Sequence, residues 1–204
     1  YECLEMGRRI FQMGVVITED VVEPISNLMY CSHLVRLSIY YSAARSADYV
    51  VTLGDLLAQN HLQTARSESL RALNLQYPDS LNRIEVAKHA VVLDETSAYS
   101  HLALAFAYAS AFDIEDEDYR FSEARAEADL AISLAPDLVW AYTTRAEVAL
   151  QQFFYHFDEK PADYHQEALD YIEIALALDP IDYQALLLQF VLLRYTPDES
   201  SQAQ

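Results

Sequence analysis

Apolar residues recur along most of the chain at the three- and four-residue spacing of amphipathic helices. The pattern predicts helices over residues 47–59, 62–76, 80–93, 97–112, 119–134, 138–155, 163–178 and 182–195. The segment 97–112 is apolar almost without interruption, so we expect that helix to be buried on most sides. Two further helical candidates, over residues 2–13 and 25–45, precede this series and carry no repeated phrase.

A short phrase, an alanine followed by aliphatic residues, closes four of these helices. It occurs at residues 72–75, 90–94, 131–136 and 175–180, and three copies have a second alanine seven positions upstream, at Ala65, Ala124 and Ala168. Two small residues separated by two helical turns form a flat stripe against which another helix can pack closely. A unit that recurs in this way predicts a stack of helical hairpins.

Composition favours an all-α fold. The chain of 204 residues has only 3 glycines and 6 prolines, and 52% of its residues are hydrophobic. It can therefore form a sizeable core, but it has few of the tight turns that sheets need. The separation between Ala72 and Ala90 leaves room for a single helix, so the pairing of helices over residues 72–93 stays open at this stage.

Two later units share a more specific pattern. The first helix of each unit carries aromatic and small residues at fixed positions. The second helix carries two small residues, and a proline follows it. The members of this pattern are Tyr99, Leu102, Ala103, Phe106, Ala124, Ala131, Leu134 and Pro136 in one unit, and Tyr142, Ala146, Ala149, Ala168, Ala175, Leu178 and Pro180 in the next. An earlier unit is matched by Leu53, Gly54, Ala65, Ala72 and Pro78. This pattern resembles the tetratricopeptide repeat.

The resemblance implies a right-handed α-solenoid of tetratricopeptide-like helix hairpins. We expect the repeat array to cover residues 47–195, behind degenerate N-terminal helices over residues 1–46. The polar segment 196–204 is expected to be a disordered tail. Aromatic residues at helix junctions are usually core in this family, which implies that Tyr99, Phe106 and Tyr142 are buried.

Both later units are longer between their two helices than the family pattern, so each is expected to carry an inserted loop. The loop residues singled out are Asp113, Glu115, Asp116, Glu117 and Asp118 in the first, and His156, Asp158, Asp163 and His165 in the second. The first lacks the glycine and ligand order of a calcium loop, and the second matches no known ligand spacing. We therefore expect solvated loops and no metal or other cofactor.

Arg145 stands where the family has a buried leucine. We expect this side chain either to pair with Asp137, Asp158 or Glu159, or to extend its charged end to water. The six histidines are scattered, and His101 lies in an alanine-rich helix, where a packed histidine is expected. We find no phosphate-binding loop and no nucleophile–base pair, so we do not expect an enzyme.

In tetratricopeptide proteins the first helices line a concave groove that holds a peptide. By register, the groove positions here are Asp48, Asp55, Ser100, Tyr108, Trp140, Thr143, Glu147 and Gln151. The acidic members disfavour an anionic ligand and favour a basic or apolar segment. Trp140 is a candidate anchor for that segment; the alternative is that it packs at a repeat junction.

The chain is strongly acidic, with 32 acidic and 13 basic residues and a formal net charge of −19. A field of this sign repels nucleic acids and anionic membrane surfaces, and it favours a basic or neutral protein partner. The most apolar stretch, residues 25–44, is interrupted by polar side chains and is not expected to insert into a membrane. Two isolated cysteines, Cys3 and Cys31, favour a reducing compartment such as the cytoplasm.

These features favour a non-catalytic scaffold or adaptor that docks a basic or apolar segment of a protein partner. One alternative is a secretion-type chaperone or assembly factor for a client protein. A third reading is a regulatory repeat fragment of a larger enzyme, because the chain begins at Tyr1 rather than at methionine. The incomplete unit that begins at Asp182 also allows a homodimer or a subunit of a larger complex.

Overall fold

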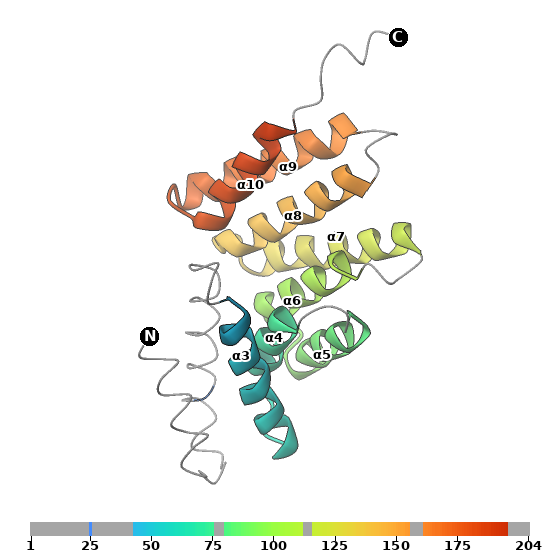
Figure 1. Cartoon of the computed structure of the whole chain (residues 1–204), viewed down its shortest axis with the longest axis vertical. Coiled ribbons are helices and arrows are strands. Elements are labelled where there is room, and N and C mark those ends of the chain that lie inside the picture. The colour runs from blue at the N-terminus through green and yellow to red at the C-terminus, as the bar shows by residue number, and fades with distance from the viewer. Residues whose placement is uncertain (1–24, 26–42, 76–79, 112–115, 156–160, 196–204) are drawn as a thin grey trace.

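The computed structural model describes residues 25, 43–75, 80–111, 116–155 and 161–195. Within these ranges every regular element is a helix, which confirms the all-α class. The helices are α3 (Ala43–Gln59), α4 (Ala65–Asn74), α5 (Ser80–Leu93), α6 (Ala98–Ala109), α7 (Glu117–Leu134), α8 (Val139–Tyr155), α9 (Pro161–Leu178) and α10 (Tyr183–Arg194). In Figure 1 they are stacked in chain order along the long axis, with α3 to α5 at one end and α9 and α10 at the other.

Side-chain caps explain where several helices begin. The side chains of Thr64, Ser97, Asp116 and Asp182 each accept a hydrogen bond from a backbone N–H three residues further on. These bonds satisfy donors that the first turn of a helix leaves without a partner. As a result α4 begins at Ala65 and α6 at Ala98, a few residues inside the predicted starts, whereas α5 has the predicted bounds.

α3 begins before its predicted start. It runs continuously from Ala43, so the expected division between residues 46 and 47 falls inside this helix. The expected N-terminal helices over residues 1–46 otherwise lie outside the described residues, apart from Ile25. The expected disordered tail over residues 196–204 lies outside them as well.

The helices pack in two interleaved series. Each helix from α3 to α9 contacts the next one in the chain. In addition, α4 contacts α6, α6 contacts α8, and α8 contacts α10. α4 therefore pairs with α5, α6 with α7 and α8 with α9. This settles the pairing that the sequence left open over residues 72–93, because α5 is the single helix between Ala72 and the next unit.

This pairing corrects the unit drawn from the sequence around Gly54 and Ala72. That unit took α3 as a first helix and α4 as its second. In the structure α4 contacts α6 as well as α3 and α5, so it belongs to the series of contacts that connects α4, α6, α8 and α10. The alanine spacing in α4 could not reveal this, because a stripe of small residues lets a helix approach any neighbour and does not select which one.

The alanine stripes themselves are where the helices meet. Ala72, Ala90, Ala124, Ala131, Ala168 and Ala175 are all fully buried. The expected burial of α6 is also confirmed, since ten of its twelve residues are buried. Around these helices lie two apolar clusters, one reaching from α4 to α8 and one joining α8, α9 and α10.

The expectation for the junction aromatics is wrong for Tyr99, whose side chain is 38% exposed. Phe106 and Tyr142 are only half-buried. The aromatic side chains that are fully buried are instead Phe121 on α7 and Phe153 on α8. The alanine-rich helix α6 already packs tightly around residues 99 and 106 without a large buried side chain at these positions.

Candidate partner-binding surface

Trp140 lies where three alternate helices meet. Its ring packs edge-on against Tyr99 of α6, with centroids 6.2 Å apart and planes at 73°. Its indole N–H donates to the side-chain oxygen of Gln184 on α10, at 3.1 Å. The amide nitrogen of Gln184 in turn donates to a carboxylate oxygen of Glu147, at 3.3 Å. Glu147 lies about two helical turns after Trp140 on α8. We call Tyr99, Trp140, Glu147 and Gln184 the Trp140 cluster.

The Trp140 cluster combines chemistry that suits a polypeptide ligand. Trp140, Glu147 and Gln184 are half-buried, and Tyr99 is exposed. An aromatic face beside a carboxylate can bind an apolar or a cationic side chain. Trp140 thus packs against side chains of α6 and α10 and is still half-buried, with some of its surface accessible. Sequence reasoning missed Gln184, because only the packing of α10 on α8 brings it to Trp140.

Three other predicted groove positions are buried. Ser100 and Thr143 have no exposed surface and Tyr108 has almost none. Ser100 lies 3.4 Å from the Ser69 hydroxyl of α4, and the Thr143 hydroxyl donates to the backbone oxygen of Trp140. Tyr108 packs edge-on against Tyr119 of α7. Ser100 and Tyr108 contact neighbouring helices, and Thr143 bonds within α8. A partner does not reach these side chains in this arrangement.

The environment of Tyr108 raises the pKa of its phenol well above the usual value near 10. Burial is the main cause, because it disfavours the charged phenolate. The hydrogen bond with Tyr119 and the nearby carboxylates of Glu123 and Glu127 act in the same direction. Tyr108 therefore stays neutral over the physiological range and acts as a structural group.

The remaining predicted groove positions do not converge with Trp140. Asp55 on α3 forms an ion pair with Arg71 of α4, at 2.7 Å. Gln151 on α8 is half-buried, and its side-chain oxygen is buried without a hydrogen-bond partner. Asp48 belongs to α3, but its side chain lies outside the described residues.

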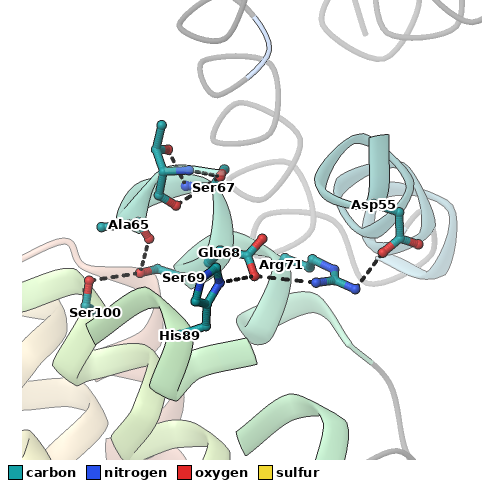
Figure 2. A network of polar contacts seen from close by, with 9 residues as sticks. Asp55, Ala65, Ser67, Glu68, Ser69, Arg71, His89 and Ser100 are labelled. Atoms are coloured by element: carbon teal, nitrogen blue, oxygen red, sulfur yellow. Dashed lines mark hydrogen bonds and ion pairs between the residues drawn. The ribbon is translucent and has the colours of Figure 1, made fainter. Parts of the chain in front are cut away.

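Asp55 instead joins a polar network between α3, α4 and α5 (Figure 2). Arg71 bridges Asp55 and Glu68, whose side chain is only 2% exposed. The same Glu68 oxygen lies 3.4 Å from the Nδ1 atom of His89 on α5. The other oxygen of Glu68 is buried without a hydrogen-bond partner. This network links three helices through one buried carboxylate, and sequence spacing alone gave no sign of it.

A second ionic network joins α7, α8 and α9. Arg145 is buried, with a 6% exposed side chain, and it contacts Asp129 at 2.9 Å and Glu167 at 2.5 Å. Arg125 pairs with the other oxygen of Glu167 at 2.7 Å and donates to Gln152. The guanidinium of Arg145 also lies 4.8 Å from the ring centre of Tyr171.

This network corrects the partners expected for Arg145. Asp158 and Glu159 lie outside the described residues. The partners of Arg145 among the described residues are Asp129 and Glu167 and not Asp137, and its side chain is buried instead of extending to water. The reason is the antiparallel packing of α9 on α8, which brings Glu167 beside Arg145 although they are far apart in sequence. A sequence-based search confined to nearby acids could not identify this pair.

An open depression on α9 borders the second network. It is lined by Asp163, Gln166, Glu167, Asp170, Tyr171 and Ile174. Burial raises the pKa of Tyr171, and the nearby Arg145 works against that rise. The lining is rich in carboxylates, so this surface is compatible with a cationic group and unfavourable for an anion.

The predicted inserted loops are shorter than expected, because the helices extend into them. Asp116 caps α7, so Glu117 and Asp118 form its first turn. Pro161 begins α9, a position where proline costs no hydrogen bond, and Asp163 and His165 are helical. His165 is buried and its Nε2 atom lies 3.2 Å from the backbone oxygen of Leu192. Asp113, Glu115, His156 and Asp158 lie outside the described residues.

His101 is buried, as expected for a packed histidine. Its Nδ1 atom lies 2.6 Å from a Glu127 carboxylate oxygen, and Nε2 lies 2.8 Å from the backbone oxygen of Glu95. Over the described ranges, no three side chains of His, Cys, Asp or Glu gather in a way that could hold a metal ion.

The chain matches no protein-family model and no curated protein sequence. None of the described helices combines the length and the apolar character needed to cross a lipid bilayer.

Proposed function

We propose that this protein is a non-catalytic scaffold that docks a basic or apolar segment of a protein partner on the Trp140 cluster. The observation that carries the proposal is the arrangement of Tyr99, Trp140 and Gln184 on three successive alternate helices, with Glu147 beside them. A row of this kind presents a preformed surface, so the protein side loses little conformational freedom on binding.

The architecture proposed for this scaffold is a right-handed α-solenoid of tetratricopeptide-like hairpins. It is supported by the alanine stripes, whose members are fully buried except for the half-buried Ala65, and by the contacts that connect α4, α6, α8 and α10 in series. In a repeat array each hairpin buries its apolar face on its neighbours, which leaves a long surface for a ligand. The net charge of −19 would accelerate encounter with a basic partner.

Trp140 makes the proposal directly testable, because it is the single tryptophan of the chain. Partners would first be captured from native lysate at low and at high salt and identified by mass spectrometry. Synthetic peptides that tile each captured partner would then be titrated while the emission of Trp140 is recorded. We expect a basic or apolar peptide to shift the emission and to protect Trp140 from an added quencher.

Glu147→Gln is the informative variant, since glutamine keeps the length and can still bond Gln184 while losing the charge. We expect it to lower the affinity for a basic peptide about three- to tenfold at low salt, and we expect a smaller effect at high salt. Glu173→Gln, an exposed charge on α9, is the matched control and should leave the affinity unchanged. Binding of an acidic peptide with an affinity that does not change with salt concentration would overturn the proposal.

A further inference from the structure

α10 is apolar on two opposite sides. Ala185, Leu188 and Leu192 are buried on one side, towards α8 and α9. The other side exposes large side chains that are 43 to 63% accessible, and we call this set the α10 face. Its members are Tyr183, Leu186, Leu187, Phe190 and Leu193. A helix that is apolar all round is normally buried all round.

The α10 face is large enough to form a stable contact. With these exposed fractions, its side chains present on the order of 600 Å² of apolar surface, as much as the largest patch of an ordinary monomer. A stable interface buries roughly 800 Å² on each partner, so a rim of neighbouring residues would complete it. α10 lies at the outer end of the stack of helices (Figure 1), where a second molecule can approach it.

The segment over residues 196–204 offers little apolar surface for the α10 face. Residues 196–204 read Thr-Pro-Asp-Glu-Ser-Ser-Gln-Ala-Gln, with no apolar side chain larger than that of proline. Such a segment supplies too little apolar surface to bury Phe190 or Leu193. Residues 196–204 are therefore a poor occupant of the α10 face.

The charges at the two ends of α10 favour a second copy of the same helix as the occupant of the α10 face. The N-terminal end carries Asp182, which caps the helix, and Asp179 just before it. The C-terminal end carries Arg194, the single charged residue within the helix. An identical helix running antiparallel would place each Arg194 near the Asp182 of the other copy, and it would also oppose the two helix dipoles favourably.

We infer that a second copy of this chain packs its α10 antiparallel on the α10 face, giving a symmetric dimer. The exposed side chains recur at i, i+3, i+4, i+7 and i+10, the spacing by which two helices interlock. A two-fold contact must be self-complementary, and this face is, because it is apolar in the middle with opposite charges at its ends. The inference does not depend on what the Trp140 cluster binds.

The oligomeric state of the 204-residue chain tests the dimer. We expect sedimentation equilibrium to show a monomer–dimer equilibrium with a micromolar dissociation constant. Phe190→Glu should raise that constant at least tenfold, because two charges would enter the apolar centre. Leu81→Glu adds the same charge at an exposed apolar position on α5 and should leave the dimer intact. A chain that stays monomeric at all concentrations, or equal effects of the two variants, would overturn the inference.

The antiparallel geometry has its own test. Near the two-fold axis a residue faces its own counterpart, and Leu187 lies close to the middle of α10. With Cys3 and Cys31 replaced by serine, Leu187→Cys should form a disulfide-linked dimer on mild oxidation. Leu193→Cys, near the helix end, should not, because antiparallel packing holds the two copies of that residue far apart. Efficient cross-linking at residue 193 and none at 187 would exclude the antiparallel arrangement.

Discussion

At the scale of single residues, buried arginines hold this helical stack together. Arg120 on α7 has no exposed surface, donates to the backbone oxygen of Ala109 at the end of α6 at 3.1 Å, and lies over the ring of Phe121. Arg83 on α5 bonds the backbone oxygen of Leu75 in the same way, just after α4. The ends of α4 and α6 carry partial negative charge from their last carbonyls, so a guanidinium stabilises them.

Arg145 differs from these two, because its partners are carboxylates on other helices. Arg145→Met would remove the ion pair with Asp129 and one of the two ion pairs of Glu167, which is mostly buried. We expect the free energy of unfolding to fall by about 2 kcal/mol, which is less than for breaking a fully buried pair because Asp129 is exposed and Arg125 still neutralises Glu167. Urea denaturation followed by circular dichroism measures this change.

Lys88→Met is the matched control for Arg145→Met. It removes a cation of similar length from an exposed pair with Glu85 on α5. Exposed pairs of this kind contribute about 0.5 kcal/mol or less. Equal losses for the two variants would show that the buried network on α7, α8 and α9 contributes nothing beyond ordinary surface charge.

Tyr108 predicts a sensitivity to alkaline pH. Its pKa is raised in the folded protein, so the unfolded chain loses the phenolic proton near pH 10 while the folded protein keeps it. The stabilisation is complete below pH 10 and decreases as the pH rises above it. Tyr108→Phe removes this group, so we expect its loss of stability between pH 8 and pH 11 to be smaller than that of the original chain by about 1 kcal/mol.

Urea midpoints at the two pH values measure the alkaline effect. Tyr195→Phe, at an exposed position after α10, serves as the control for the substitution itself. If Tyr108→Phe lost as much stability between pH 8 and pH 11 as the original chain does, burial of this phenol would not be a source of alkaline sensitivity.

At the scale of helices, the contact between α3 and α4 depends on a glycine. A β-carbon at Gly54 would come within 2.8 Å of Cδ and 3.1 Å of Cβ of Arg71. Arg71 cannot move aside freely, because Asp55 and Glu68 both hold its guanidinium. The close approach of these two helices therefore requires the absence of a side chain at residue 54.

Gly54→Ala tests this contact with two opposing effects. Alanine favours a helix over glycine by about 1 kcal/mol, but the steric conflict with Arg71 should outweigh that gain. We expect a net destabilisation of about 1 kcal/mol in urea denaturation. In a chain that already carries Arg71→Ala, the same change should cost clearly less, since the contacts with Cγ and Cδ are gone and only the 3.1 Å approach to Cβ remains. A stabilising effect in both backgrounds would show that α3 and α4 are not closely packed here.

At the scale of the whole molecule, charge is the dominant feature. A net charge of −19 on 204 residues makes the compact state repel itself. The ion pairs described above are mostly buried or partly buried, so salt screens them less than it screens the general repulsion. Salt should therefore stabilise this protein, in contrast to a chain with balanced charges.

Thermal unfolding at rising sodium chloride concentration measures the balance. We expect the midpoint to rise by several degrees between about 20 mM and 500 mM salt, where the screening length falls from roughly 20 Å to about 4 Å. Sodium perchlorate and sodium chloride at equal ionic strength separate screening from specific ion effects. A midpoint that falls with salt would mean that the ion-pair networks outweigh the self-repulsion.

Local sequence pattern determined the helices of this protein. The spacing of apolar residues predicted each of the described helices to within a few residues, and capping side chains such as Thr64 and Asp116 account for most of the differences. The alanine stripes could also be predicted from the sequence, because a small residue repeated after two turns allows close packing in any helix. These are properties of a helix and its own side chains.

Tertiary structure alone decided which helices meet and therefore which side chains form a site. Whether α4 packs as a first or a second helix, and whether Arg145 finds Glu167 or a nearer acid, depends on contacts between segments far apart in the chain. The Trp140 cluster depends on the same fact, since Gln184 reaches Trp140 only when α10 packs on α8. A helical pattern specifies that a face will be buried, but the choice of partner is a property of the whole assembled stack.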